Sequence, residues 1–172
     1  FTGVSAPETM VGAFGRDRDN QDGILELSRL VLHPDYNGKN YGSFFLGYCL
    51  RDLKKKGYEA VISYASSDLH TGAIYQSSNW KYYGTSNDKK DFYRDVDGKL
   101  VKQERGKTKD VKGVWVQRPI KHRYIFPLKK RINILWKQEE YPKGNNNNNT
   151  CYGCNGVGKV TNQKMGLEYD CP

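Results

Sequence analysis

The cysteines near the end of the chain carry the most specific chemical signal in the sequence. Of four cysteines, three gather there, and Cys151 and Cys154 are spaced as Cys-x-x-Cys before Cys171. Two thiolates on a tight knuckle can chelate zinc, but a closed structural site takes four ligands. We therefore expect a partial zinc knuckle in a reducing compartment rather than a disulfide framework, with flexible reduced cysteines as the alternative.

A second chemical candidate is the glycine-bearing loop at residues 35–42, which lies between an apolar run and a helical pattern. A strand that ends in such a loop and opens a helix presents free N–H groups to an anion, so a diphosphate could bind there. Because neither GxxxxGK[ST] nor GxGxxG is present, the loop is not a Walker motif or a dinucleotide fingerprint. An ordinary connection is the alternative.

Polar side chains also fall at predicted strand ends, where a substrate would approach. We take them as candidate catalytic residues, with ordinary surface, strand or loop roles as the alternative for each: Ser28, Arg29, Ser63, Asp68 and His70.

The charge balance favours a polyanionic partner. Lys and Arg number 28 against 19 acidic residues, which gives a net charge of +9. Nucleic acid, an acidic membrane surface, cofactor phosphates or plain solubility would all fit. No segment approaches the roughly 20 apolar residues of a membrane span, and no signal peptide is evident, so we expect no membrane partner and a cytoplasmic protein.

The elements that position these groups follow from hydrophobic periodicity. Residues 24–32 alternate and then become continuously apolar, which predicts a strand ended by His33 and Pro34. A helix is expected over 43–56 with Gly57 as its stop, and a strand over 59–65 completes a parallel βαβ unit. The predicted core face of that helix comprises Phe45, Leu46, Cys49, Leu50 and Leu53.

The rest of the chain gives shorter signals. We expect a strand over 10–14, a short helix over 73–78, and late strands over 114–116 and 123–128. The polar stretch 88–112 is predicted to be an exposed excursion. An Asn-rich run then indicates three parts: a main domain over 1–140, a linker over 141–150 and the cysteine knuckle over 151–172.

The run 30–42 resembles the acyl-CoA signature of GNAT acyltransferases, in which [RQ]-x-x-G-x-[GA] follows a V-x-P lead. Asn37 replaces the usual Arg or Gln, Asn40 replaces the middle Gly, and Gly42 matches. The resemblance implies an α/β (α+β) GNAT fold, a mixed central sheet with flanking helices whose first strands are expected upstream of Phe1. It also implies that acetyl-CoA lies on Leu30, Val31, Leu32, Asn37, Gly38, Lys39, Asn40, Tyr41, Gly42 and Ser43.

The downstream segment 73–80 sits where GNAT proteins carry A-x-x-x-Y-x-x-x-G-F. By that likeness Tyr75 would protonate the coenzyme A thiolate as it leaves. A tyrosine that only packs the helix is the alternative.

Further blocks resemble the phage Mom family, which modifies adenine in DNA. They are 26–30, 62–65, 70–76 with Asn79, Trp80 and Gly84, and 121–124, and together they cover about residues 25–124. Ser66 stands where the family tends to have Asp after Ser-Tyr-Ala. The likeness implies that a phage-encoded enzyme in the host cytoplasm transfers an acetyl-CoA-derived group to the exocyclic amine of adenine. The product would be a methylcarbamoyl modification that protects phage DNA from restriction.

Such an enzyme must flip the adenine out of the duplex or act on exposed single strand. Aromatic and basic residues could supply stacking and phosphate contacts, although a basic run is often just a solvated face. The candidates are Tyr64, Trp80, Lys81, Lys121, His122, Arg123, Lys129, Lys130 and Arg131.

The C-x-x-C-x-G-x-G stretch at 151–158 resembles half of a DnaJ-type zinc repeat. Two other functions stay open at this point. One is a conventional GNAT N-acetyltransferase acting on a small amine, a protein or an RNA. The other is a catalytically silent nucleic-acid-binding module, which the two departures in the phosphate loop favour.

Overall fold

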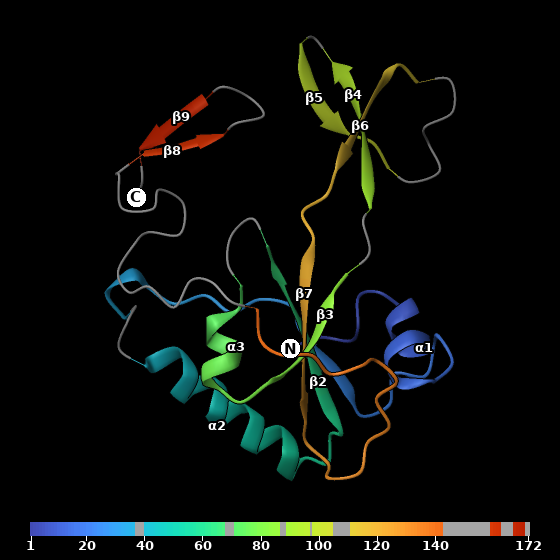
Figure 1. The fold of residues 1–172 in the computed structure, drawn as a ribbon, viewed down its shortest axis with the longest axis vertical. Helices are drawn as coiled ribbons and strands as arrows, with labels where there is room; N and C mark the ends of the chain where they lie inside the picture. The colour runs from blue at the N-terminus through green and yellow to red at the C-terminus, as the bar shows by residue number, and fades with distance from the viewer. Residues whose placement is uncertain are drawn as a thin grey trace.

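A computed structural model describes residues 1–36, 40–67, 71–86, 89–96, 98–104, 111–142, 159–162 and 167–170 (Figure 1). The helices are α1 (Glu8–Phe14), α2 (Tyr41–Lys55) and α3 (Ala73–Ser77), with a 3-10 turn at Pro34–Tyr36. The strands are β1 (Ile24–Leu27), β2 (Ala60–Ser66), β3 (Lys81–Thr85), β4 (Lys90–Val96), β5 (Lys99–Lys102), β6 (Gly113–Gln117), β7 (Lys121–Pro127), β8 (Lys159–Asn162) and β9 (Leu167–Asp170).

The main sheet has the strand order β1-β2-β7-β3. β1 and β2 are parallel and are joined through α2, which confirms the predicted βαβ unit. β7 runs antiparallel to both of its neighbours, β2 and β3. The sheet is therefore mixed, as expected, and its central strand β2 is apolar on both faces because both faces are covered.

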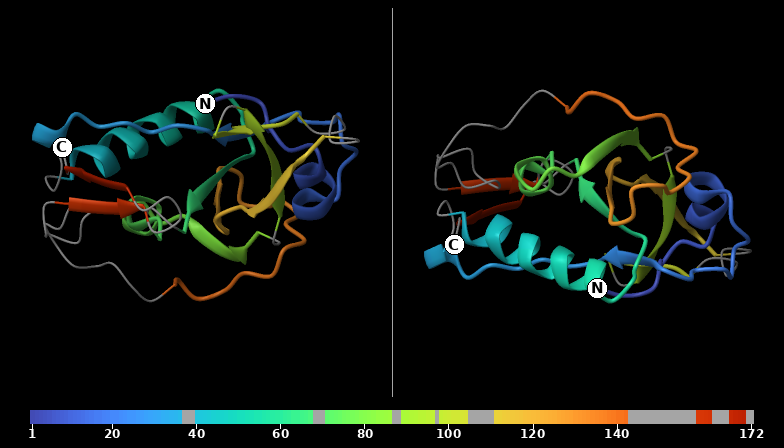
Figure 2. Two further views of the ribbon diagram at one scale, coloured as in Figure 1. Left: turned by 90° about the horizontal axis from the view of Figure 1, so that it is seen from above. Right: turned by 90° about the horizontal axis from the view of Figure 1, so that it is seen from below.

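Helices cover the two faces of this sheet (Figure 2). On one face α2 and α3 pack through Leu46, Leu50 and Tyr75. On the other face α1 packs through residues such as Met10, and the segment around Trp136 adds to this layer. The carboxyl ends of β1 and β2 remain open between these layers, which is where ligands bind in parallel αβ units.

The structure overturns the predicted strand at 10–14. These residues belong to α1, whose buried residues Thr9, Met10, Ala13 and Phe14 have helical rather than alternating spacing. The apolar stretch was too short to distinguish the two periods. Gly15, with φ +63°, ends the helix.

The strand predicted over 24–32 is also too long. β1 ends at Leu27, where its ladder with Ser63 stops, and Val31 is 86% exposed. Residues 28–33 lie outside any strand because the ladder with β2 does not continue beside them.

The core face of α2 is narrower than predicted. Gly42, Leu46, Leu50 and Leu53 are buried, whereas Phe45 is 56% exposed. Gly57 follows the helix with φ +89°, as expected of its stop.

Most of the described residues in the stretch 88–112 are exposed, as predicted, but the excursion also contains strands that the sequence did not predict. β4 and β5 within it pair with β6 to form a second, three-stranded sheet in the order β5-β4-β6, called the inserted sheet below. Asp91 and Phe92 are buried in it.

Candidate active site

The two parallel strands separate at Leu27. Beyond the pair formed by Leu27 and Ser63, residues 64–66 of β2 pair with β7 alone. The segment that follows β1 makes no further pairs with β2. The carboxyl ends of β1 and β2 and the first turn of α2 therefore meet at one end of the sheet. This is the end at which the sequence placed most of its candidate catalytic residues.

A buried hydroxyl cluster lies at this point of separation. The Ser63 Oγ is 2.8 Å from the Leu27 carbonyl oxygen and 2.8 Å from the Tyr75 hydroxyl. Ser63 has one proton to give, and the Leu27 carbonyl has none. Whenever Ser63 donates to Leu27, the Tyr75 hydroxyl can therefore donate to Ser63.

The ring of Tyr75 packs against two other aromatic rings. It stacks on Tyr124 with centroids 4.9 Å apart and meets the edge of Trp80 at 5.2 Å. Burial raises the pKa of Tyr75, and the hydrogen bond with Ser63 offsets this only in part. At neutral pH the phenol is protonated, so it can serve as an acid.

Tyr124 secures the turn that starts α3, and the sequence did not single it out for this role. Its hydroxyl donates to the Thr71 carbonyl and accepts from Gln76 Nε2 at 3.3 Å. Burial raises the pKa of Tyr124 to about 12. The sequence predicted that Tyr124 lies on a strand, but it did not show that its hydroxyl reaches the Thr71 carbonyl.

A groove of about 720 Å³ runs beside α2. It is bounded by α2, by the residues that follow α3 and by the end of β7. Arg51 and Lys54 bring positive charge to it, while Asn40 and Ser43 bring polar groups from the start of the helix. Apolar parts of its wall include Phe44 and Phe126.

The first turn of α2 leaves backbone donors free. No side chain caps the helix, and Asn40 takes a left-handed conformation with φ 57°. The first N–H groups of a helix have no partner within it, so this end attracts anions. A ligand that carries phosphates at one end and an apolar arm at the other would fit this set of groups.

Gly42 has a packing reason to be glycine. A Cβ there would lie 2.8 Å from the Ile74 Cδ1 and 3.0 Å from the Leu32 Cδ1. The glycine lets α2 approach α3 and the chain that leaves β1. Its match to the phosphate-loop pattern is therefore explained at least in part by close packing.

Of the remaining predicted site residues, some are described by the structure and others are not. Ser28 and Arg29 are exposed just beyond β1, and the Ser28 Oγ lies 3.3 Å from the Thr2 Oγ1. Leu30 and Leu32 are half-buried and Tyr41 is exposed. Those that lie outside the described residues are Asn37, Gly38, Lys39, Asp68, His70, Cys151, Cys154 and Cys171.

Trp80 is a correction among the predicted nucleic-acid contacts. Its side chain is fully buried against Tyr75 and Phe126, so it has no surface to offer a base. An aromatic side chain at this position suggested that it stacks on a base. The structure instead directs the Trp80 ring into the core just after α3 ends.

Other predicted contacts lie near the open end of the sheet. Lys121 is exposed, and its Nζ lies 6.0 Å from the centre of the Tyr64 ring. The His122 Nδ1 lies 2.9 Å from the Tyr82 hydroxyl. Arg123 is half-buried with its guanidinium 4.2 Å from the Trp136 ring, and burial lowers its pKa.

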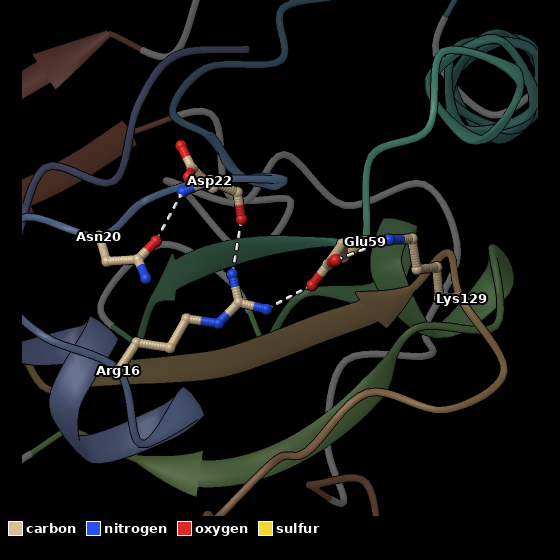
Figure 3. Close-up of polar contacts among 5 residues, drawn as sticks. All are labelled: Arg16, Asn20, Asp22, Glu59 and Lys129. Atoms are coloured by element: carbon tan, nitrogen blue, oxygen red, sulfur yellow. Dashed lines mark hydrogen bonds and ion pairs between the residues drawn. The ribbon is translucent and has the colours of Figure 1, made fainter.

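Lys129 lies at the opposite end of the sheet (Figure 3). Its Nζ is 2.6 Å from a Glu59 carboxylate oxygen, and Arg16 contacts the other oxygen. This places Lys129 in a structural ion cluster. Lys81, Lys130 and Arg131 are exposed.

The described residues contain no group of three or more His, Cys, Asp or Glu side chains that could hold a metal. Among them there is also no helix long and apolar enough to cross a membrane.

The fold and this arrangement define a mixed α/β protein with a buried tyrosine at the point where β1 and β2 separate and a groove that runs along α2. The sequence model of the Mom protein family matches residues 3–143, and the chain belongs to that family. Among solved structures, the ribosomal-protein-S18-alanine N-acetyltransferase from Escherichia coli matches at 16% identity with a TM-score of 0.38. That match covers 62% of this chain and 56% of the enzyme, so it spans little more than half of the enzyme's length. No curated protein matches the chain.

Proposed function

We propose that this protein is a DNA-modifying acyltransferase that transfers an acetyl-CoA-derived group to the exocyclic amine of adenine. Membership of the Mom protein family supports this proposal. The observation that carries it is the Tyr75 hydroxyl, which is buried at the point where β1 and β2 separate. The proposal includes a phage-encoded enzyme at work in the host cytoplasm, where the modification would protect DNA from restriction.

The groove beside α2 would hold acetyl-CoA. Its phosphates would meet the free N–H groups of the first turn of α2 and the charges of Arg51 and Lys54. Backbone groups of Leu30, Val31 and Leu32 would bind the extended arm, because this segment leaves β1 just as the sheet opens.

The transfer step forms a bond between the adenine nitrogen and the acyl carbon and breaks the bond from that carbon to sulfur. The amine loses one proton, and the departing thiolate gains one. Tyr75 would give the second proton from its hydroxyl, since burial keeps that phenol protonated at neutral pH. Ser63 would position Tyr75, while Ser28, Arg29, Asp68 and His70 remain candidates near the amine.

Simple acetyl transfer leaves an acetamide on adenine. A methylcarbamoyl product therefore requires a further conversion after or within this step, and the mass of the product distinguishes the two.

The test is to incubate the protein with acetyl-CoA and duplex DNA, digest the DNA to nucleosides, and measure the mass of deoxyadenosine. A mass increase that depends on acetyl-CoA is the expected result. Unmodified DNA despite bound acetyl-CoA would favour a conventional N-acetyltransferase with a small amine, a protein or an RNA as acceptor. DNA binding without any binding of acetyl-CoA would favour a catalytically silent module.

A further inference from the structure

The inserted sheet projects from the same end of the main sheet as the candidate active site (Figure 1). The chain leaves the main sheet after Thr85 and returns at Lys121, which pairs with Ser66 at the end of β2. Ser66 is three residues beyond Ser63, or about 10 Å along the strand. A ligand on the inserted sheet would therefore lie near the end of β2, whose Ser63 contacts the hydroxyl of the buried Tyr75.

The register divides the inserted sheet into two unlike faces. Paired residues share a face, and β4 pairs with both neighbours. The basic face, as it is called here, carries Lys90, Phe92, Arg94, Val96, Lys99, Val101, Trp115 and Gln117. The opposite face carries both aspartates of the three strands, Asp91 and Asp95.

The charges of the opposite face are balanced internally. Asp91 lies 2.6 Å from the Lys102 Nζ and also contacts Arg118. These two cations hold the pKa of Asp91 at about 2, with the Arg118 hydrogen bond as the larger cause. That face therefore offers little free positive charge.

The basic face keeps its charge available. Lys90, Arg94 and Lys99 are exposed, and within the described part of the chain none of them forms an ion pair. Trp115 is 60% exposed and meets the edge of Phe92 at 5.2 Å. Residues 89–121 hold eleven Lys and Arg against five Asp and Glu, so this segment supplies six of the chain's nine net positive charges.

We propose that the basic face binds the DNA substrate beside the target adenine, with Arg94 and Lys99 on phosphates and Trp115 stacked on a base. The inference rests on the proposed function and adds the surface that recognises its substrate. Strands of this kind fit a groove of DNA, and an exposed aromatic ring stacks on bases that leave the helix. The unpaired cations select a polyanion, and the ring selects one that carries bases.

The test measures binding of the full chain to a labelled duplex as salt is varied. The double variant Arg94→Ala and Lys99→Ala is compared with Lys55→Ala and Lys137→Ala, two exposed lysines away from the inserted sheet. Loss of two phosphate contacts should lower the slope of log affinity against log salt by about 1.8. The control pair should keep the wild-type slope.

A second variant tests the ring. Trp115→Ala should weaken binding to DNA with an unpaired adenine roughly tenfold and leave the salt slope unchanged. Trp115→Phe should restore most of that affinity, since a phenyl ring can still stack and still pack on Phe92. The circular dichroism spectrum of Trp115→Ala should match that of the wild type. A matching spectrum would show that the weaker binding comes from lost stacking and not from misfolding.

The inference would be overturned if the Arg94 and Lys99 double variant kept the wild-type salt slope and Trp115→Ala kept the wild-type affinity. So would variants that lose binding to vesicles of anionic lipid while binding DNA normally. The modification assay runs in parallel. If DNA is modified yet the variants bind normally, this inference fails alone. If DNA binding depends on the basic face but no adenine is modified, the proposed function fails and the inference stands.

Discussion

Ser63 connects the candidate catalytic tyrosine to the strand that ends beside it. The Ser63 hydroxyl can donate its one proton either to the Leu27 carbonyl or to the Tyr75 hydroxyl, so the hydrogen bonding of the phenol depends on the backbone of β1. Because the site is buried, an unmade hydrogen bond there would be costly, and the cluster is expected to be rigid.

Replacing Tyr75 with Phe should slow turnover by about 10²-fold or more, because a positioned acid contributes that much to a proton transfer. Acetyl-CoA binding should be retained, since the ring still packs on Tyr124 and Trp80. Single-turnover rates and donor affinity measured together check this. Ser63→Ala is the matched variant, and it should slow turnover less because the phenol remains. Unchanged turnover in Tyr75→Phe would remove Tyr75 from the mechanism.

The fate of aromatic residues shows the limit of sequence at this scale. Tyr75 and Trp80 were both singled out by residue type and neighbouring motif. The structure buries both rings, which keeps a hydroxyl role open for the tyrosine and ends the stacking role of the tryptophan. Periodicity over a helix as short as α3 cannot tell which side chains turn inward, because one turn gives almost no pattern.

The ion cluster around Glu59 predicts a pH-dependent stability. Hydrogen bonds from Lys129 and Arg16 lower the pKa of Glu59 from its ordinary 4.5. A lowered folded-state pKa means that the stabilisation is complete above pH 4.5 and is lost as the pH falls through the folded-state value. Glu59→Gln should therefore cost about 1 kcal/mol at neutral pH, a figure reduced for partial exposure, and much less in acid.

Urea unfolding of the wild type and of Glu59→Gln at neutral and acid pH measures this difference. Glu8→Gln is the control, because Glu8 pairs with Arg18 at a site where both side chains are more than half exposed. An equal effect of both substitutions would contradict a special role for the cluster.

Among the elements, the strongest sequence patterns were placed best. α2, β2 and β7 were expected close to their observed bounds, because each is long or strongly apolar. α1 was mistaken for a strand, and β1 was drawn too long, since its apolar residues continue after its ladder has ended. In the inserted sheet, β6 was expected at 114–116, whereas β4 and β5 were missed. β5 is exposed along its whole length, so its sequence shows no alternation of apolar and polar residues.

The turn before α3 makes a prediction about two glycines with similar backbone angles. Gly72 has φ +90°, and a Cβ there would lie 2.6 Å from the Tyr124 ring and 2.9 Å from that of Tyr75. Gly57 has φ +89° with nothing within 4 Å of its Cβ position. Gly57→Ala should cost about 1 kcal/mol for the left-handed conformation alone. Gly72→Ala should cost about 3 kcal/mol, since the tyrosine rings must also move.

Thermal or urea unfolding of the two variants measures this gap in stability. Turnover should fall in Gly72→Ala and stay normal in Gly57→Ala, because only the first displaces Tyr75. Equal costs would show that the rings yield without strain.

At the scale of the whole molecule, charge and chemistry gather at one end of the main sheet. The open ends of β1 and β2, the first turn of α2 and the inserted sheet all lie there. The opposite end carries the Glu59 cluster, whose charges are paired. The overall positive charge was visible in the sequence, but the placement of Lys90, Arg94 and Lys99 on one face of the inserted sheet depended on strand register. A DNA duplex bound at the open end could therefore touch the inserted sheet and the candidate active site together.

The cysteines at 151–172 provide the last prediction at this scale. They lie outside the described residues, but β8 and β9 pair antiparallel with Lys159 opposite Asp170. The start of β8 thus lies beside the end of β9, and in the sequence Cys154 precedes the first position and Cys171 follows the second. Zinc bound by these thiolates would stabilise a segment with few apolar residues. The purified chain should carry about one zinc ion after desalting, and Cys154→Ser should lose it.

Cys49→Ser is the matched control, because that free cysteine lies half-buried on α2 and should not affect zinc content. Zinc lost equally from both variants would place the metal elsewhere. A reduced chain free of zinc, with every cysteine open to alkylation, would instead establish flexible thiols. DNA modification measured after chelation then decides whether the knuckle matters to the reaction: if modification continues at the wild-type rate, the metal serves the stability of the C-terminal segment alone.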